Sequence, residues 1–169
     1  MSVNHIPDGY TTVTPYLVVP DVLLQLDFLQ RAFGAVETLR LPGPDGHITH
    51  AEARLGNAMV MMGTPLGETL KSQIHLYVED VDAAFTAALA AGATVVRDVA
   101  NQYYGDRSGQ VQDPNGNFWF IATHVEDVSP DEMRRRMTAL ASVHDDTDGG
   151  ASTGAAKSGE AKEPEPARS

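Results

Sequence analysis

Hydrophobic and polar positions alternate along two stretches of the chain that are rich in β-branched and aromatic residues. These stretches, VTPYLVV (13–19) and IHLYV (74–78), predict strands. An aspartate follows each of them, Asp21 and Asp80, in a position that suits the cap of a helix. The apolar residues of the first predicted helix recur at i, i+4, i+7 and i+11 and form one stripe: Val22, Leu26, Leu29 and Phe33.

The same pattern occurs twice, at an offset of about 60 residues. YLVVPDV (16–22) is echoed by HLYVEDV (75–81), and LGNAMVM (55–61) by NGNFWFI (115–121). Each unit then contains further strand candidates, near 36–41, 48–55 and 58–62 in the first and near 94–97, 108–112 and 118–123 in the second. The predicted order is β-α-β-β-β, repeated once, which indicates an α+β fold built from a duplicated unit.

The end of the chain differs in character from the two units. Ser129, Pro130 and Glu132 form a capping box, which predicts a C-terminal helix over 129–142. From His144 onward the chain has no aromatic or large aliphatic residue, so ordering it would bury little apolar surface. We therefore expect residues 143–169 to form a disordered tail, and the tail is acidic.

Composition narrows the classes of function. The chain has 169 residues with 12 basic and 23 acidic ones, a formal net charge of −11. This charge disfavours binding to nucleic acid or to an anionic membrane, and no apolar run approaches the length that crosses a bilayer. The one basic cluster, Arg134–Arg136, is expected on a solvated helix face. The absence of cysteine excludes disulfides and thiolate chemistry, and we expect a cytoplasmic protein.

Several short motifs, taken together, resemble one family. They are FGA, PDG, HAEARLG, YVEDVDAAF, YGDRSG, DPNGN and ATHVEDVSPDE. With the doubled β-α-β-β-β unit, they resemble the vicinal oxygen chelate superfamily, in its glyoxalase/bleomycin-resistance-like branch. The resemblance implies a domain over residues 1–128 made of two βαβββ modules, about 10–65 and 72–128. In such proteins the mixed sheets curl into paired half-cups, with helices outside and the ligand inside.

Strand parity identifies the face that would meet a ligand. Along 118–123, Trp119 and Ile121 lie on one face, while Phe118 and Phe120 lie on the other. The same alternation of aliphatic with aromatic or polar residues occurs in the first strand of each unit. The aliphatic face suits packing under helices, and the other face suits a ligand cavity. We therefore predict ligand contacts from that face and from nearby loops: Tyr16, His50, Gln73, His75, Tyr77, Tyr104, Arg107, Phe118 and Phe120.

Metal-dependent relatives carry four ligands, mostly His and Glu, on four of these strands. The resemblance places those positions on Thr14, Gln73, Phe120 and either Val60 or Met61. Only Gln73 could offer a reasonable oxygen ligand among them, because valine, methionine and phenylalanine are not oxygen or imidazole donors. We therefore predict no metal and no cofactor.

Acid–base chemistry has one set of candidates. His50 and Glu52 alternate on the strand ITHAEARL, so both side chains lie on one face, and a cluster with His75 is conceivable. His50 and Glu52 are therefore the candidate catalytic residues, and the alternative is a histidine that is only hydrogen-bonded to its neighbours in a polar cup. Asp106 and Arg107 are expected to fix a loop, either by an ion pair or by backbone hydrogen bonds. His124 is expected to pair with nearby acids.

Three functions remain open. The first is a metal-independent small-molecule-binding protein of the resistance or sequestration type, with an aromatic-lined cup. Its ligand would be apolar or aromatic, and the negative net charge would favour a cationic one. The second is a glyoxalase-like lyase or isomerase that uses His50 and Glu52 as acid and base. The third is a non-catalytic interaction module. The cups form either within one chain or between the two chains of a homodimer.

Overall fold

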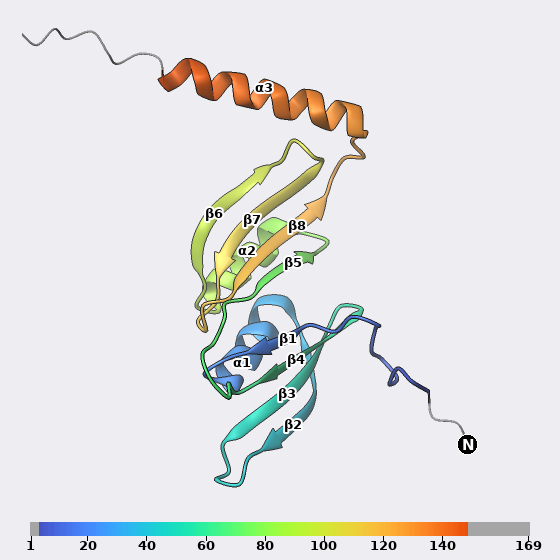
Figure 1. The fold of residues 1–169 in the computed structure, drawn as a ribbon, viewed down its shortest axis with the longest axis vertical. Helices are drawn as coiled ribbons and strands as arrows, with labels where there is room; N and C mark the ends of the chain where they lie inside the picture. Colours follow the sequence, from blue (N-terminus) through green and yellow to red (C-terminus); the bar gives the residue numbers. More distant parts are fainter. Residues whose placement is uncertain (1–3, 149–169) are drawn as a thin grey trace, which may run out of the picture. The chain divides into compact units, whose positions relative to one another are not determined.

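The computed structural model describes residues 4–148, with side chains described for residues 4–140. Its contacts divide the chain into two units, Met1–Val128 and Ser129–Ser169. The first unit contains two successive modules with the same order of helices and strands (Figure 1). The described part of the second unit, residues 129–148, contains one helix.

The first module forms a four-stranded sheet covered by one helix. Its elements are β1 (Tyr16–Val18), α1 (Val22–Phe33), β2 (Val36–Pro42), β3 (Ile48–Leu55) and β4 (Ala58–Gly63). The strand order is β1-β4-β3-β2, with β1 parallel to β4 and the other pairs antiparallel. The sheet is therefore mixed, and β1 is one of its edges.

The second module repeats this arrangement. Its elements are β5 (Gln73–Tyr77), α2 (Val81–Ala90), β6 (Thr94–Asn101), β7 (Asp106–Gln112) and β8 (Phe118–His124). The strand order is β5-β8-β7-β6, and β5 runs parallel to β8. The predicted α+β fold of two βαβββ modules is confirmed.

Both helices begin at the aspartates expected to cap them. The carboxyl oxygen Oδ1 of Asp21 accepts a hydrogen bond from Leu24 N (2.9 Å), and that of Asp80 accepts one from Ala83 N (3.0 Å). The first helix ends at Gly34, which has a left-handed backbone (φ 67°) that glycine adopts without steric strain. Local capping thus sets where each helix starts and where α1 stops.

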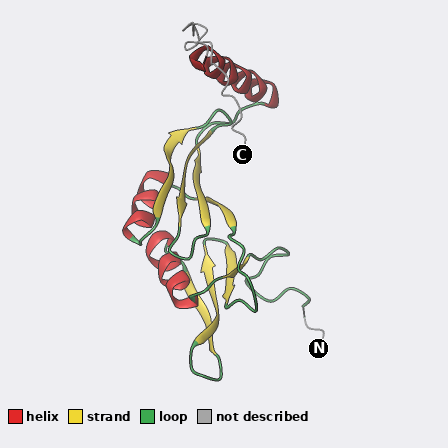
Figure 2. Ribbon diagram, turned by 60° about the vertical axis from the view of Figure 1, so that its left-hand side comes forward, coloured by secondary structure: helices red, strands yellow, loops and turns green. Residues whose placement is uncertain are grey.

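The hydrophobic core lies between the helices and one face of each sheet. Leu17, Val19, Trp119 and Ile121 are all buried, as strand parity predicted. Figure 2 shows α1 and α2 on the same side of the strands, and the two helices contact each other. One core cluster spans both modules. Neither α1 nor α2 therefore covers the opposite face of its sheet.

A buried polar network joins the two modules. The amide Nε2 of Gln25, in α1, donates a hydrogen bond to Asp113 Oδ2 in the DPNGN turn (2.9 Å). Asn115 and Asn117 of the same turn both donate to Gln25 Oε1 (3.1 Å each). The indole of Trp119 donates to Asp113 Oδ2 (2.9 Å). The DPNGN turn therefore docks the second module onto the helix of the first.

The second unit contains α3 (Pro130–Asp148), which begins with the predicted capping box: Ser129 Oγ accepts from Glu132 N at 3.3 Å. The helix continues past the predicted end at residue 142, because no glycine or proline interrupts the chain before Gly149. Residues 143–148 are therefore helical, and the rest of the predicted disordered tail lies outside the described residues. Arg134 and Arg135 pair with Asp131 and Glu132, as on a solvated helix face.

No helix within residues 4–148 combines the length and hydrophobicity that a membrane crossing requires.

Candidate functional site

The face of each sheet that lies opposite the helices carries exposed aromatic side chains. Tyr16 on β1 is 50% exposed and Tyr77 on β5 is 61% exposed, whereas Leu17 next to Tyr16 is buried. We call these two surfaces the open faces of the first and second sheets.

On the open face of the first sheet, four side chains form a chain of contacts. The hydroxyl of Tyr16 lies 3.4 Å from His50 Nδ1, and His50 Nε2 lies 3.1 Å from Glu52 Oε1. Glu52 Oε2 also accepts a hydrogen bond from the Tyr10 hydroxyl. Gly63 is the register partner of His50 and lies directly under the Tyr16 ring, where a Cβ would collide with the Tyr16 hydroxyl. The glycine thus leaves space for Tyr16 to reach His50.

Glu52 is the polar centre of this chain of contacts. It is buried, and two neighbouring side chains supply hydrogen bonds to its two oxygens. The contact with the carboxyl group raises the pKa of Tyr10, because a phenol that donates to a carboxylate is harder to ionise. Tyr10, which comes before β1, was not among the predicted site residues, and no local pattern distinguishes it.

On the open face of the second sheet, His75 and Phe120 are stacked. Their ring centroids are 6.1 Å apart and the rings are inclined by only 4°. Tyr77 extends the row, with its ring centroid 4.8 Å from that of His75. His75 and Phe120 are register partners across β5 and β8, so the regular geometry of the sheet produces the stack.

The ends of these strands carry two more predicted contacts. Gln73 and Phe118 are also register partners across β5 and β8. The ammonium group of Lys71 lies 5.9 Å from the centroid of the Phe118 ring, within the range of a cation–π contact. The aromatic surface of the second sheet therefore runs from Phe118 through Phe120 and His75 to Tyr77.

A buried carboxyl group anchors the far end of that surface. Asp106 accepts hydrogen bonds from the Tyr77 hydroxyl (2.9 Å) and contacts His124 Nδ1 (2.8 Å). Asp127 contacts the other ring nitrogen of His124 (3.1 Å), so His124 pairs with nearby acids as predicted. Hydrogen bonding to Asp106 raises the pKa of Tyr77, and hydrogen bonding to Asp106 and Asp127 raises that of His124.

Asp106 and Arg107 do not pair with each other. They lie in β7 and not in a loop, and successive residues of a strand point to opposite faces. Arg107 therefore turns away from Asp106 and pairs with Asp82 at the start of α2, through two nitrogen–oxygen contacts of 2.7 Å. Its side chain takes no part in the aromatic row, although it was predicted as a ligand contact.

Tyr104 lies close to the open face of the second sheet. Its hydroxyl is 3.4 Å from Ser108 Oγ, and its ring packs edge-on against Tyr103 with centroids 5.1 Å apart. Ser108 pairs with Ala122 in the register of β7 and β8. The YYGDRSG stretch thus brings one tyrosine hydroxyl to the edge of the predicted ligand surface.

Comparison with protein families connects this architecture with a known group. The family model described as "Glyoxalase/Bleomycin resistance protein/Dioxygenase superfamily" matches residues 3–121. The chain belongs to this superfamily. The resemblance drawn from the sequence motifs is therefore confirmed, and superfamily membership accounts for the doubled βαβββ fold.

Relatives within the superfamily include mycobacterial proteins. The chain is 42% identical over 141 residues to uncharacterized protein Mb0911c of Mycobacterium bovis. The alignment covers 75% of this chain and 92% of that protein. It is equally similar to uncharacterized protein Rv0887c of Mycobacterium tuberculosis, of which it covers 82%.

Solved structures of the superfamily share the fold. TioX from Micromonospora sp. ML1 superposes with a TM-score of 0.61 at 30% identity and covers 68% of this chain and 99% of TioX. Lactoylglutathione lyase from Agrobacterium tumefaciens superposes with a TM-score of 0.55 at 20% identity, covering 69% of this chain and 94% of the lyase. The similarity to the lyase, at 20% identity, is a similarity of fold alone.

The residues at the superfamily's metal-ligand positions do not form a donor set for a divalent ion. Val60 is buried in the core, so Met61 is the residue of β4 on the open face, beside Tyr16 and Glu52. Thr14 precedes β1, and its hydroxyl donates to Thr11 O (3.2 Å). Phe120 supplies a hydrocarbon ring. Within the described part of the chain, no group of three or more His, Asp or Glu side chains could hold a metal ion.

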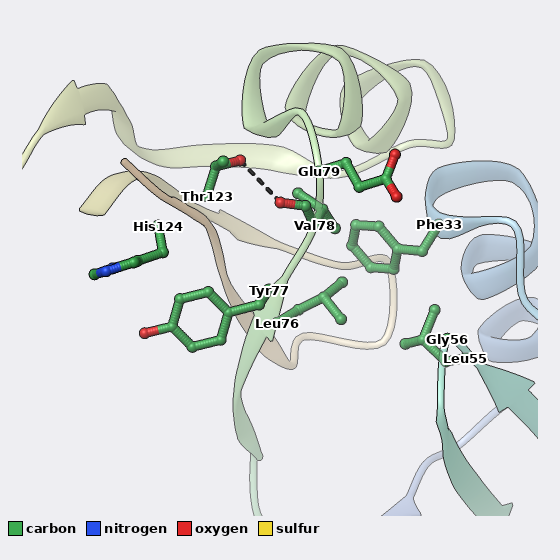
Figure 3. A pocket seen from close by; sticks show the side chains of 9 residues that line it. All are labelled: Phe33, Leu55, Gly56, Leu76, Tyr77, Val78, Glu79, Thr123 and His124. Atoms are coloured by element: carbon green, nitrogen blue, oxygen red, sulfur yellow. Dashed lines mark hydrogen bonds between the residues drawn. The ribbon is translucent and has the colours of Figure 1, made fainter. Parts of the chain in front are cut away.

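A cavity of about 650 Å³ opens beside β5. Figure 3 shows Tyr77 and His124 on one side of this strand, and Phe33 and Leu55 of the first module on the other. Of the residues that the sequence predicted as ligand contacts, Tyr77 alone lines this cavity. The others that line it are Phe33, Leu55, Gly56, Leu76, Val78, Glu79, Thr123 and His124. Sequence reasoning missed these eight, because the cavity arises where two modules meet.

The predicted site residues thus fall into two groups. Tyr16 and His50 lie together on the first sheet, and Gln73, His75, Tyr77, Phe118 and Phe120 lie along the second: β5 and β8 bring these five together. Among the described residues, no hydrogen bond or ring contact joins the two groups, and His75 does not join His50 and Glu52. These predicted ligand contacts therefore lie on two separate sheet faces.

Proposed function

We propose that the chain binds an aromatic or apolar small molecule on the open faces of its sheets, without a metal ion. The observation that carries this proposal is the stack of His75 and Phe120, with Tyr77 beside it. Flat rings held parallel on a sheet provide a surface on which another flat ring gains contact area and a favourable stacking geometry. Each good aromatic contact contributes about 0.5–1.5 kcal/mol beyond the burial of area.

The chemistry of Phe120 supports binding without metal. The resemblance places a metal-binding residue of related proteins at this position, and here the side chain cannot coordinate an ion. In related proteins a metal ion bound at this position can polarise a substrate, whereas the phenylalanine ring offers only an apolar contact. A resistance or sequestration role, in which the ligand is held and not transformed, follows from this exchange.

A homodimer fits the same proposal. Tyr16 and Tyr77 are 50% and 61% exposed. A binding site usually buries most of the surface of its ligand, so further protein surface would be needed to cover a ligand at these residues. An open face from one copy could close over an open face from a second copy, and the two partial surfaces would then form one cup. We also place the protein in the cytoplasm, since a chain without cysteine has no need of an oxidising compartment.

A thermal-shift screen of aromatic compounds against the full chain tests the proposal, followed by binding measurements on Phe120→Glu. The variant should bind apolar hits about tenfold more weakly, since it loses stacking and adds a charge that must be desolvated. Leu66→Glu is the matched control, because Leu66 is fully exposed in a loop and the variant adds the same charge. An unchanged ligand profile in Phe120→Glu would refute the proposed site.

A second function is favoured by one observation, the 3.1 Å contact between His50 Nε2 and Glu52 Oε1. A histidine oriented by a buried carboxyl group can take a proton from a carbon beside a carbonyl and return it to the neighbouring carbon. Such an isomerisation needs an electrophile to stabilise the enediolate. The residues at the superfamily's metal-ligand positions provide no suitable set of donors for a metal ion in that role. Turnover of a hemithioacetal that is lost in Glu52→Gln, and retained in Asp27→Asn on the exposed surface of α1, would support this lyase-like function.

A further inference from the structure

Arg97 on β6 is held by neutral side chains on the second sheet. Its Nη1 donates to Gln102 Oε1 (3.1 Å) and its Nη2 donates to Ser108 Oγ (3.0 Å). The remaining nitrogen, Nε, is buried and has no hydrogen-bond partner, and it is the one side-chain atom in this condition among those described. Buried donors without an acceptor are rare in folded proteins, so this one requires an explanation.

Other arginines in the described part of the chain have a different environment. Arg31, Arg40 and Arg107 each pair with a carboxylate of a neighbouring side chain, and so do the arginines of α3. Arg97 and Arg54 alone among residues 4–140 have no carboxylate partner. Arg54 is exposed, so water solvates its charge, whereas Arg97 is half-buried. The nearest carboxylate along β7 on the same face, Asp106, contacts Tyr77 and His124, so Arg97 itself has only neutral hydrogen-bond acceptors.

The guanidinium lies on the open face of the second sheet. Gly109 points toward the helix side, because a Cβ there would meet the ring of Phe85 in α2. Its neighbour Ser108 therefore points to the opposite face, and the hydrogen bond to Ser108 places the Arg97 guanidinium on that face. Arg97 is the register partner of Gln110 in β7, and Gln110 is the register partner of Phe120 in β8, so Arg97 and Phe120 lie in one row, two strands apart. The charge and the aromatic row therefore lie on the same face of the second sheet, with β7 between them.

We propose that Arg97 recognises a carboxylate on the ligand, so that the second sheet takes an aromatic carboxylate with its ring on Phe120 and His75. This inference rests on the proposed function and specifies the ligand class of the same site. A guanidinium has five N–H donors, of which two are used here, and its planar fork matches the two oxygens of a carboxylate. A carboxylate on the ligand would supply acceptors for the unused N–H groups and the direct ion-pair partner that Arg97 lacks.

The net charge of −11 disfavours an anionic ligand, whereas Arg97 would favour one. Net charge governs how charged ligands approach, through a field that salt screens over about 8–10 Å. The group that touches the ligand governs the bound state, because a half-buried charge is screened much less. The net charge therefore predicts a preference for a cationic ligand, and the contact with Arg97 predicts a preference for an anionic one. Ligands that differ only in charge can distinguish the two.

Three naphthalene derivatives provide that set: 2-naphthoate, neutral 2-naphthamide and cationic 2-naphthylmethylammonium. Titrations of the full chain should give naphthoate an affinity about tenfold above that of naphthamide. In Arg97→Gln this preference should fall to about twofold or less, with naphthamide binding little changed. Arg54→Gln removes the other unpaired arginine and should keep the preference.

The NMR signal of the Arg97 Nε–H group supplies a readout that does not depend on a variant remaining folded. It should shift with naphthoate and not with naphthamide in the unmodified protein. Equal affinities for the two ligands, tighter binding of the cation, or a preference that survives in Arg97→Gln would overturn the inference while leaving aromatic binding intact. Failure of all three compounds to bind would overturn the aromatic surface itself.

Discussion

The side-chain amide of Gln25 lies 2.9 Å from the carboxyl oxygen of Asp113, and both residues are buried. One belongs to the helix of the first module and the other to the DPNGN turn of the second. The contact therefore holds together two halves that otherwise repeat each other. Buried polar contacts of this kind depend on every donor and acceptor being satisfied, so the junction is sensitive to single substitutions.

Removing the carboxyl group should destabilise the domain. Asp113→Ala leaves the Gln25 amide and the Trp119 indole N–H without their acceptor inside the protein. The expected loss is about 3 kcal/mol in the free energy of unfolding, measured by urea denaturation. Asp27→Ala is the control, because Asp27 is an exposed acid of α1 whose pair with Arg31 contributes less than about 1 kcal/mol. Equal losses in the two variants would contradict a special role for Asp113.

Close packing under the second sheet gives another prediction. A Cβ at Gly109 would lie 2.7 Å from Phe85 Cε2 and 2.9 Å from Val99 Cγ2. Gly109→Ala should therefore lower the free energy of unfolding by about 1–3 kcal/mol, since the buried ring has to shift. Gly67→Ala meets no atom within 4 Å and should be neutral or slightly stabilising. Thermal unfolding of the two variants, side by side, distinguishes a packing effect from a general effect of losing glycine.

The pH dependence of stability should include a contribution from His124. Its pKa in the folded protein is raised above the ordinary 6.5 by hydrogen bonding to Asp106 and then Asp127. A raised folded-state pKa means that the protonated ring stabilises the fold. This stabilisation is fully present below the unfolded-state pKa and is lost as pH rises through the folded-state value.

Two measurements check this contribution. An NMR titration of the His124 ring should give a midpoint above 6.5, and Asp127→Asn should lower it. The stability difference between the unmodified protein and His124→Gln should also be larger at pH 5.5 than at pH 8.5. His47→Gln, in the turn between β2 and β3, is the comparison variant. A difference that grows with increasing pH would show the sign to be reversed.

Metal removal should leave the protein unchanged. Met61 and Phe120 stand on the open faces where the superfamily resemblance places metal ligands, and neither coordinates a hard divalent ion. Dialysis against EDTA should therefore shift the unfolding temperature by no more than about 1 °C, and adding nickel, zinc or manganese should not raise it. Stoichiometric metal in the purified protein, or a large loss of stability in EDTA, would rule out metal-independent binding.

The local features of this fold could be predicted because they depend on neighbouring residues. Period-2 alternation assigned Trp119 and Ile121 to the core and Phe120 to the open face, and burial confirms this assignment. The capping positions of Asp21 and Asp80 followed from side-chain hydrogen bonding over three residues. Sequence reasoning failed at Arg107, where adjacent opposite charges suggested a pair, although strand geometry separates them onto opposite faces.

The sequence by itself determined the repeated unit, its helices and strands, and which side chains of each strand share a face. Those properties arise from interactions within a few residues, and the two repeated units show the same pattern. Only the tertiary structure decided that Asp113 meets Gln25, that Arg97 bonds to Ser108 and not to a carboxylate, and that His75 stacks on Phe120. These relationships depend on strand register and on how two modules dock, and residues that are far apart in the chain carry no local signal of either.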